Sequence, residues 1–184
     1  MKDKNIAIFG CKKTTLFLLE SISCKYNISH IITISPDKNS RIIVPDYCDL
    51  TQFAESNNIS IYHCNKYSLK NNSDIKHINN LKIDIAFVMG WQRLIPEEIL
   101  NNITIGVFGM HGSSPNLPKG RGRSPMNWSI IEGRKHFYTN LFKYKPGIDD
   151  GDIVDTVKFS ITNRDTAETM HFKNMICMKY LILK

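Results

Sequence analysis

The chain has 184 residues, of which 42% are hydrophobic and 22% are charged, and its formal net charge is +7. This length is sufficient to bury a core, and the composition excludes an intrinsically disordered protein. The positive charge permits an anionic partner, but the lysines are scattered and no run reaches the roughly five like charges typical of a nucleic-acid-binding arm. We therefore expect one globular domain over residues 1–184 and do not expect nucleic acid as its partner.

The cysteines and the hydropathy pattern bear on the cellular compartment. The five cysteines are odd in number and never form a CxxC pair, which favours reduced thiols over a disulfide framework or a zinc site. The N-terminal apolar run is too short for a secretory signal, and no run of about 18 apolar residues could span a membrane. We expect a cytoplasmic protein that uses no metal and has no membrane partner.

The first two-thirds of the chain alternate between predicted strands and helices. Residues 5–10 form an apolar run that ends in glycine, as a buried strand does, and apolar residues at helical spacing follow from Leu16. Further strands are predicted at 28–35, 59–62, 83–91 and 104–108, with helices over 48–58 and after Pro96 and a polar loop with a weak helix over 64–82. This order predicts an α/β fold with a doubly wound, mostly parallel sheet.

The start of the first predicted helix is a candidate phosphate site. Free N–H groups at a helix N-terminus would meet the ammonium groups of Lys12 and Lys13 there. An ordinary capped helix with solvated lysines explains the same residues equally well, because there is no GxGxxG pattern.

The last third of the chain contains two polar motifs after apolar runs. His111 follows the strand predicted at 104–108, and a helix is expected to end at Gly133. Strands predicted at 139–144 and 153–161 flank the loop that contains Asp149, and a capping pattern at residues 165–168 begins a last helix whose periodicity continues to Leu183 without a cap. Since α/β sheets place chemistry in loops at strand ends, His111 and Asp149 are candidate reactive residues. The missing cap leaves open that the natural domain continues.

Two ordered motifs carry a family resemblance. The first, HGSSPNLPKGRGRSP, runs from His111 to Pro125, and the second, GIDDGDI, runs from Gly147 to Ile153. They resemble the N-x-H-x-S-x-L-P…G…P and L-D-x-G-x-I signatures of the folate-dependent formyltransferases, which include the glycinamide ribonucleotide, methionyl-tRNA and sugar-nucleotide enzymes. The resemblance extends across the whole chain and implies a Rossmann-like sheet of the formyltransferase type.

The resemblance also implies a reaction. A formyl group would move from 10-formyltetrahydrofolate to an amine, which requires polarisation of the formyl oxygen and a route for the amine proton. His111 would supply both, and Asp149 would orient or charge it. The alternative is that these two residues are a hydrogen-bonded loop histidine and a turn aspartate.

One departure from the family signature affects the predicted chemistry. The family's asparagine, two residues before the histidine, is replaced by Gly109, and the loop after His111 is about two residues longer. We hypothesise that Asn116 or Ser113 supplies the missing hydrogen-bond donor. An inactive relative that only binds folate or nucleotide, and a slow enzyme, are the alternatives, since removing one such donor typically costs about 10²–10³ in rate.

The resemblance implies further binding residues. Folate would be bound by the segment after the fourth strand and by the loop of the carboxylate, that is by Met89, Gly90, Trp91, Gln92, Leu94, Ile95, Gly147 and Asp150. Trp91 could equally stack on the pterin or close the edge of the core. Basic residues could contact the anionic part of the acceptor or form a basic surface loop: Lys119, Arg121 and Arg123, besides Lys12 and Lys13.

Two features of the sequence bear on the identity of the acceptor. The family's tRNA enzymes carry an additional C-terminal domain, and its purine enzymes carry a glycine-rich loop after the first strand, where this chain has Cys11 to Thr15. We expect a small, phosphate-bearing amine, best represented by a nucleotide-linked amino sugar. A truncated methionyl-tRNA formyltransferase and a non-catalytic binding module remain open, and so does a homodimer.

Overall fold

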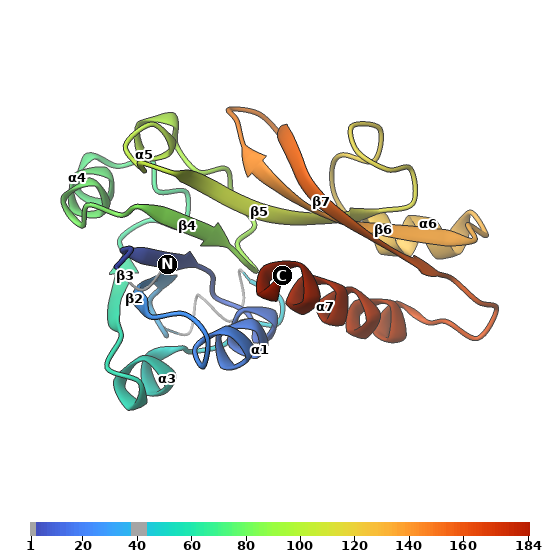
Figure 1. Ribbon diagram of the computed structural model, residues 1–184, viewed down its shortest axis with the longest axis horizontal. Coiled ribbons are helices and arrows are strands. Elements are labelled where there is room, and N and C mark those ends of the chain that lie inside the picture. Colours follow the sequence, from blue (N-terminus) through green and yellow to red (C-terminus); the bar gives the residue numbers. More distant parts are fainter. Residues whose placement is uncertain (1–2, 38–43) are drawn as a thin grey trace. The chain divides into compact units, whose positions relative to one another are not determined.

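The computed structural model describes residues 3–37 and 44–184. The chain divides into two compact units, residues 1–108 and 109–184. The strands follow the order β3-β2-β1-β4-β5-β6-β7 in one hydrogen-bonded sheet (Figure 1). Within the first unit, β1 pairs in parallel with β2 and with β4, and β2 pairs in parallel with β3. The predicted α/β fold with a mostly parallel sheet is confirmed.

The first unit has helices on both faces of its parallel strands. In Figure 1, α1 and α3 lie on one side of these strands, and α4 and α5 lie on the other. This arrangement follows from right-handed crossovers that run outward from β1 and then return to β4. Its elements are β1 (Ile6–Phe9), α1 (Lys13–Ile22), β2 (Ile28–Ile34), α3 (Thr51–Ser56), β3 (Ser60–Cys64), α4 (Asn72–Asn80), β4 (Ile85–Val88) and α5 (Glu97–Leu100).

Apolar burial explains why these segments form strands. All four residues of β1 are buried, and Ile8 and Phe9 are fully inaccessible to solvent. A fully buried aliphatic or aromatic side chain contributes about 1.5–3 kcal/mol, so a short run of this kind can hold the centre of the sheet. The apolar pattern therefore predicted the central strands correctly.

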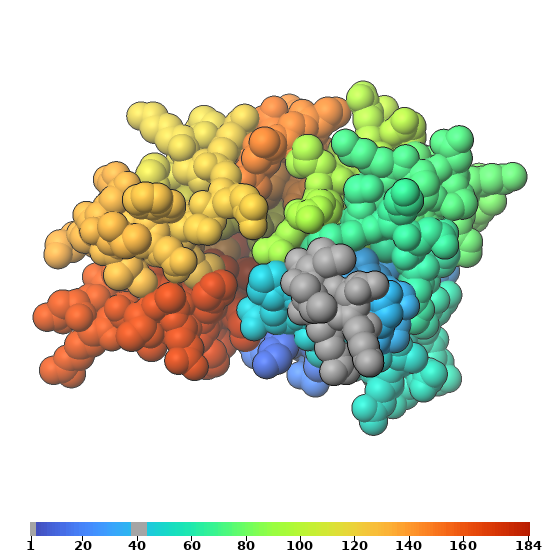
Figure 2. Space-filling view, turned by 180° about the vertical axis from the view of Figure 1, so that it is seen from behind, coloured from blue at the N-terminus to red at the C-terminus, as the bar shows by residue number. Residues whose placement is uncertain are grey.

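The second unit contains the end of β5 and an antiparallel pair of long strands. Its elements are β5 (Gly106–Ser113, which begins in the first unit), α6 (Pro125–Ile131), β6 (His136–Tyr144), β7 (Gly151–Ser160) and α7 (Ala167–Leu183). β6 pairs with β7 from His136 opposite Ser160 to Tyr144 opposite Gly151. Helix α7 contacts β6, β7 and α6. Figure 2 shows α6 and the first turns of α7 side by side, in yellow-orange and red-orange.

Three local predictions need correction. The strand predicted to end at Phe108 continues to Ser113, so His111 lies inside β5 rather than in a loop. The glycines around it have low strand propensity, but the neighbouring β6 supplies backbone hydrogen-bond partners that keep the segment extended. The fourth strand ends at Val88, not Trp91. The polar stretch 64–82 contains a defined helix, α4, because the side chain of Asn71 accepts a hydrogen bond from the Asp74 N–H.

Candidate active site

His111 is held by two acceptors in the second unit. Its Nδ1 lies 3.4 Å from Asp149 Oδ1, and its Nε2 lies 2.7 Å from the carbonyl oxygen of Gly120. The side chains of His111 and Asp149 are 11% and 23% exposed, so the pair is shielded without being closed to solvent. Since a carboxylate and a carbonyl only accept hydrogen bonds, an imidazolium could donate to both partners. The ring is thereby fixed in orientation at the end of β5.

Asp149 is placed by a tight turn between β6 and β7. Its backbone lies in the left-handed region, with φ of 46°, and Gly147 has φ of 139°. The second carboxylate oxygen, Oδ2, accepts a hydrogen bond of 2.8 Å from the N–H of Gly122. A non-glycine residue in this backbone region costs about 1–3 kcal/mol, and such strain occurs often at functional sites. The turn thus holds one carboxylate between His111 and the loop that follows β5.

The loop after β5 uses its own polar side chains. Ser113 is fully buried, and its hydroxyl donates to the carbonyl of Pro115 at 2.9 Å. Asn116 Oδ1 accepts from the N–H of Leu117 at 3.0 Å, just before a cis bond between Leu117 and Pro118. The single hydroxyl proton of Ser113 is therefore already used within the loop, while the side-chain amide of Asn116 keeps its N–H groups for another acceptor.

An ion pair joins the loop after β5 to the turn between β6 and β7. Arg121 Nη2 donates to Asp150 Oδ1 at 2.8 Å, with side-chain exposures of 39% and 40%. Arg121 therefore has a carboxylate partner in the structure, whereas Lys119 and Arg123 are exposed. An exposed ion pair of this kind contributes only about 0–1 kcal/mol, so an anionic ligand could compete for the guanidinium. The expected acceptor-binding role of these cations stays a prediction.

Tyr144 is a site residue that the sequence analysis missed. It is the last residue of β6, and its ring stacks on Phe142 with ring centroids 4.9 Å apart. Burial, reinforced by the negative charge of Asp149, raises the pKa of the Tyr144 phenol above its usual range, so the phenol stays protonated at neutral pH. The available signal was Gly109, because a glycine inside a strand often marks the close approach of another group.

The residues predicted to bind folate lie mainly in the first unit, in the segment after β4. The N–H of Met89 donates to the carbonyl of Phe9 at 2.8 Å, and Thr15 Oγ1 donates to the carbonyl of Met89 at 2.5 Å. Gly90 has φ of 75°, and a Cβ there would lie 2.6 Å from Thr15 Oγ1. Leu94 is 51% exposed, whereas Ile95 is buried. The backbone of this segment is thus fixed to β1 and α1.

Trp91 and Gln92 are joined by Tyr67, another residue that the sequence analysis missed. The Trp91 ring packs edge-on against Tyr67 at 4.7 Å and against Phe9 at 6.3 Å, and Trp91 is 8% exposed. These contacts favour the core-edge interpretation of Trp91. Tyr67 Oη accepts from the N–H of Gln92 at 2.8 Å. No local pattern identified Tyr67, because it lies in the polar stretch between β3 and α4.

The start of α1 offers less for a phosphate than the sequence suggested. Lys12 is the N-cap residue, and its N–H donates to Thr15 Oγ1 at 3.2 Å. The N–H of Lys13 donates to the carbonyl of Asp46 at 3.0 Å. Two backbone donors of this turn therefore have protein partners, and a phosphate site here stays a prediction.

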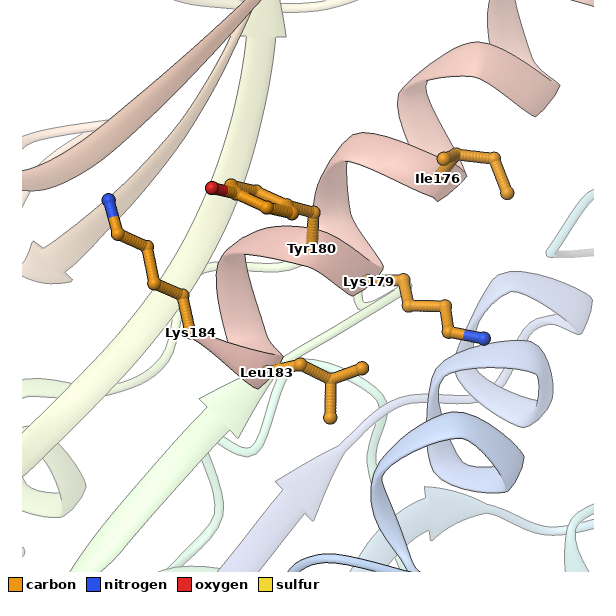
Figure 3. A pocket seen from close by; sticks show the side chains of 5 residues that line it. All are labelled: Ile176, Lys179, Tyr180, Leu183 and Lys184. Carbon is orange, nitrogen blue, oxygen red and sulfur yellow. The ribbon is translucent and has the colours of Figure 1, made fainter.

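A separate hollow of about 400 Å³ lies along the C-terminal half of α7. Figure 3 shows its lining side chains, none of which is a predicted site residue: Ile176, Lys179, Tyr180, Leu183 and Lys184. Across residues 3–37 and 44–184, His, Cys, Asp and Glu side chains form no group of three that could hold a metal ion. Within the same ranges, no helix is long and apolar enough to cross a membrane.

The fold and the site together define a Rossmann-like α/β protein with a histidine–aspartate pair between a strand and a turn. The formyl transferase family model matches residues 4–175, so the chain belongs to the formyl transferase family. The family suggested by the two sequence motifs is thereby confirmed.

Curated relatives include methionyl-tRNA formyltransferases. That of Bacteroides fragilis (strain YCH46) is 29% identical over 178 residues, which are 95% of this chain and 52% of the relative. That of Azobacteroides pseudotrichonymphae is 32% identical over 161 residues, or 86% of this chain and 48% of the relative. The bifunctional polymyxin resistance protein ArnA of Wigglesworthia glossinidia brevipalpis is 34% identical over 110 residues, or 60% of this chain and 16% of the relative. The chain thus spans about half the length of the methionyl-tRNA formyltransferases that it matches.

Solved structures with this fold include a formyltransferase and a deformylase. The phosphoribosylglycinamide formyltransferase of Bacillus halodurans has a TM-score of 0.78 and 18% identity, and the match covers 97% of this chain and 91% of that one. A formyltetrahydrofolate deformylase of Pseudomonas syringae has a TM-score of 0.77 and 16% identity, and the match covers 98% of this chain and 58% of that one. These likenesses establish the fold.

Proposed function

We propose that this protein is an N-formyltransferase, which moves a formyl group from 10-formyltetrahydrofolate to the primary amine of a nucleotide-linked amino sugar. The observation that carries the proposal is the fixed histidine of the second unit, with Nδ1 3.4 Å from Asp149 Oδ1 and Nε2 2.7 Å from the Gly120 carbonyl. Family membership supports the reaction class. The choice of an amino sugar as acceptor follows from the expectation, drawn from the sequence, that the substrate is a small amine that bears phosphate.

The proposed reaction needs one group that stabilises charge and carries a proton. As the amine nitrogen bonds to the formyl carbon, the carbonyl electrons move to oxygen. When the carbonyl re-forms, the bond from carbon to the folate nitrogen breaks, and that nitrogen takes up the proton that the amine has lost. His111 would carry this proton on Nε2, with the reacting groups replacing the Gly120 carbonyl as the partner of that nitrogen, while Asp149 stabilises the imidazolium.

The segment after β4 has features that suit a folate donor. The indole of Trp91 packs on Phe9 and closes the edge of the core there. Leu94 presents an exposed apolar side chain, and the positive φ of Gly90 turns the backbone there. Gly90 and Leu94 would then contact the ring system of the donor.

Charge on the loop after β5 supports a phosphate-bearing acceptor. Lys119 and Arg123 are exposed, and neither side chain pairs with a carboxylate in the described part of the chain. A diphosphate would gain charge-assisted hydrogen bonds from them. The second candidate acceptor is methionyl-tRNA, which the methionyl-tRNA formyltransferase relatives and the net charge of +7 favour.

The experiment that tests this proposal compares acceptors directly. The protein is mixed with 10-formyltetrahydrofolate and either a panel of nucleotide-linked amino sugars, methionyl-tRNA or glycinamide ribonucleotide, and tetrahydrofolate release is followed. We expect release that depends on one amino sugar and is lost in His111→Asn. His171→Asn is the matched control, because His171 is an exposed histidine of α7 in the same unit.

Other outcomes would redirect the assignment. Release that depends on methionyl-tRNA, with an affinity that falls steeply with salt, would replace the sugar by tRNA. Release without any added amine would make water the acceptor. Folate binding without release under all conditions would show a binding module and would contradict the proposed function.

A further inference from the structure

Gly109 has no room for a side chain because the phenol of Tyr144 occupies its place. An ideal Cβ at Gly109 would lie 2.2 Å from Tyr144 Cε1, 2.5 Å from Oη and 2.6 Å from Cζ. Such distances are far below van der Waals contact, so a side chain at position 109 would require the ring of Tyr144 to move. Glycine is therefore required on β5 as long as Tyr144 keeps this position on β6.

The phenol lies on the strand face that carries His111. Gly109 and His111 are two residues apart in β5, and alternate residues of an extended strand project to the same face. A group that occupies the Cβ direction of Gly109 is thus on the side of the imidazole. The influence of the Asp149 charge on the phenol is in accord with this placement.

The hydroxyl is oriented and available. The Tyr144 ring is fixed by stacking on Phe142, with an interplanar angle of 24°. Among the residues that the structure describes, none forms a hydrogen bond with Tyr144 Oη. This oxygen is also absent from the buried polar atoms that lack a partner, so it retains some solvent-accessible surface. A protonated phenol carries one O–H donor and can offer it to a ligand.

We propose that Tyr144 Oη donates a hydrogen bond to the formyl oxygen of the donor, from the position that the side chain of the family's asparagine would otherwise fill. The inference rests on the proposed function. In the reaction, Tyr144 keeps its proton: its O–H stabilises the negative charge that develops on the formyl oxygen, while His111 carries the amine proton to the folate nitrogen. Tyr144 thus supplies the hydrogen-bond donor in place of the missing amide, and Gly109 leaves the space that the Tyr144 ring occupies.

This assignment differs from the donors suggested by the sequence. The Ser113 hydroxyl already donates to the Pro115 carbonyl, and Asn116 lies beyond the end of β5, in the following loop. Tyr144, in contrast, touches the strand position at which the family signature has its asparagine. The three candidates are separable by single substitutions.

The main test is Tyr144→Phe, assayed by tetrahydrofolate release with the acceptor identified for the wild type. We expect kcat to fall by about 10²–10³ while the fold is kept, because one preorganised donor to the oxyanion is removed. Tyr138→Phe, on the same strand, is the matched control and is expected to stay within about 3-fold of the wild type, because that hydroxyl has no role in the proposed site. Asn116→Ala and Ser113→Ala are compared in the same assay.

A second readout does not depend on turnover. With 10-formyltetrahydrofolate labelled with ¹³C in the formyl group, the infrared carbonyl stretch of the bound donor reports hydrogen bonding to its oxygen. We expect a higher wavenumber in Tyr144→Phe than in the wild type and no change in Tyr138→Phe. An unchanged stretch would contradict the inference.

A paired exchange tests the shared position. Gly109→Asn alone is expected to fold poorly, because its Cβ would collide with the ring of Tyr144. Gly109→Asn combined with Tyr144→Ala has room for the amide and is expected to be at least about 10-fold more active than Tyr144→Ala alone, since one oxyanion donor is restored.

The outcomes separate the two claims. An active wild type with a Tyr144→Phe variant of equal activity would overturn the role of Tyr144 and leave the proposed function intact. If the wild type releases no tetrahydrofolate with any acceptor, the proposed function fails and this inference fails with it. A folded double variant no more active than Tyr144→Ala would also count against the shared position.

Discussion

The central strand of the first unit, β1, buries only apolar side chains, whereas β6 of the second unit buries a hydroxyl and an amide next to the strand that carries His111. Every residue of β1 is buried and apolar, and the buried stretch of β2 from Ile31 to Ile34 includes one hydroxyl, that of Thr33. The described residues of the second unit have buried polar side chains on four elements: Ser113 on β5, Ser129 on α6, Thr139 and Asn140 on β6, and Asn174 on α7.

The buried polar side chains of β6 have hydrogen-bond partners on neighbouring elements. Thr156 Oγ1 donates to Asn140 Oδ1 at 2.7 Å, and Asn140 Nδ2 donates to the backbone carbonyl of His111 at 3.5 Å. Thr139 Oγ1 donates to Asn174 Oδ1 at 2.7 Å. Satisfied polar networks in a low-dielectric interior specify one arrangement more strictly than apolar packing does. In the second unit, Asn140 thereby supports the strand backbone that carries His111.

The largest expected effect that would test this comparison is that of Asp149→Asn. Asparagine tolerates the positive φ of 46° and keeps an oxygen for the Gly122 N–H, so the turn should persist. The negative charge beside His111 is lost, and we expect kcat to fall by about 10² or more in the tetrahydrofolate assay. Asp152→Asn is the control, because its carboxylate is 75% exposed and pairs with Lys145 on the surface. Equal activity of both variants would remove Asp149 from the reaction.

The next effect is on stability, in Asn140→Ala. The side chain is fully buried, and its loss leaves the Thr156 hydroxyl without its acceptor and weakens the support of the His111 carbonyl. We expect the free energy of unfolding in urea to fall by about 1–3 kcal/mol, with a lower kcat as well. Thr156→Val and the double variant complete a cycle, and additive losses would show that the two residues are not coupled.

In the first unit, Thr15→Val is the corresponding test. Thr15 is fully buried, accepts from the Lys12 N–H at 3.2 Å and donates to the Met89 carbonyl at 2.5 Å. Valine keeps the shape, so we expect a loss of about 1 kcal/mol in unfolding free energy, a raised KM for the folate donor and little change in kcat. Thr104→Val, at an exposed position, is the control. A fall in kcat as large as that of Asn140→Ala would abolish the contrast between the units.

The parts of this structure that the sequence predicted are those that local patterns determine. Apolar runs identified β1 and β2, and the capping pattern placed the start of α7, whose N-cap is Thr166. The motifs pointed to His111 and Asp149, which the structure brings within 3.4 Å. The extension of β5 through His111 was not predictable, because neighbouring strand pairing overrides the low strand propensity of glycine. The contact of Tyr144 with Gly109 depends on cross-strand register, which no local pattern specifies.

The smallest expected effect is that of Asp165→Asn on the free energy of unfolding. Asp165 lies just before α7 and forms an ion pair with Lys173 of that helix. The Lys173 ammonium donates to Asp165 Oδ2 at 2.7 Å, as does the Thr162 N–H, and these contacts hold the pKa of the carboxyl below its usual range. Since the folded-state pKa is the lower one, the stabilisation is present above about pH 4 and is lost as pH falls through the folded-state value. Asp165→Asn should therefore lower the free energy of unfolding by about 1 kcal/mol at pH 7, with a smaller difference from the wild type in strong acid. Urea unfolding at several pH values measures this, and a difference independent of pH would assign the stabilisation to the hydrogen-bond geometry of the turn instead of its charge.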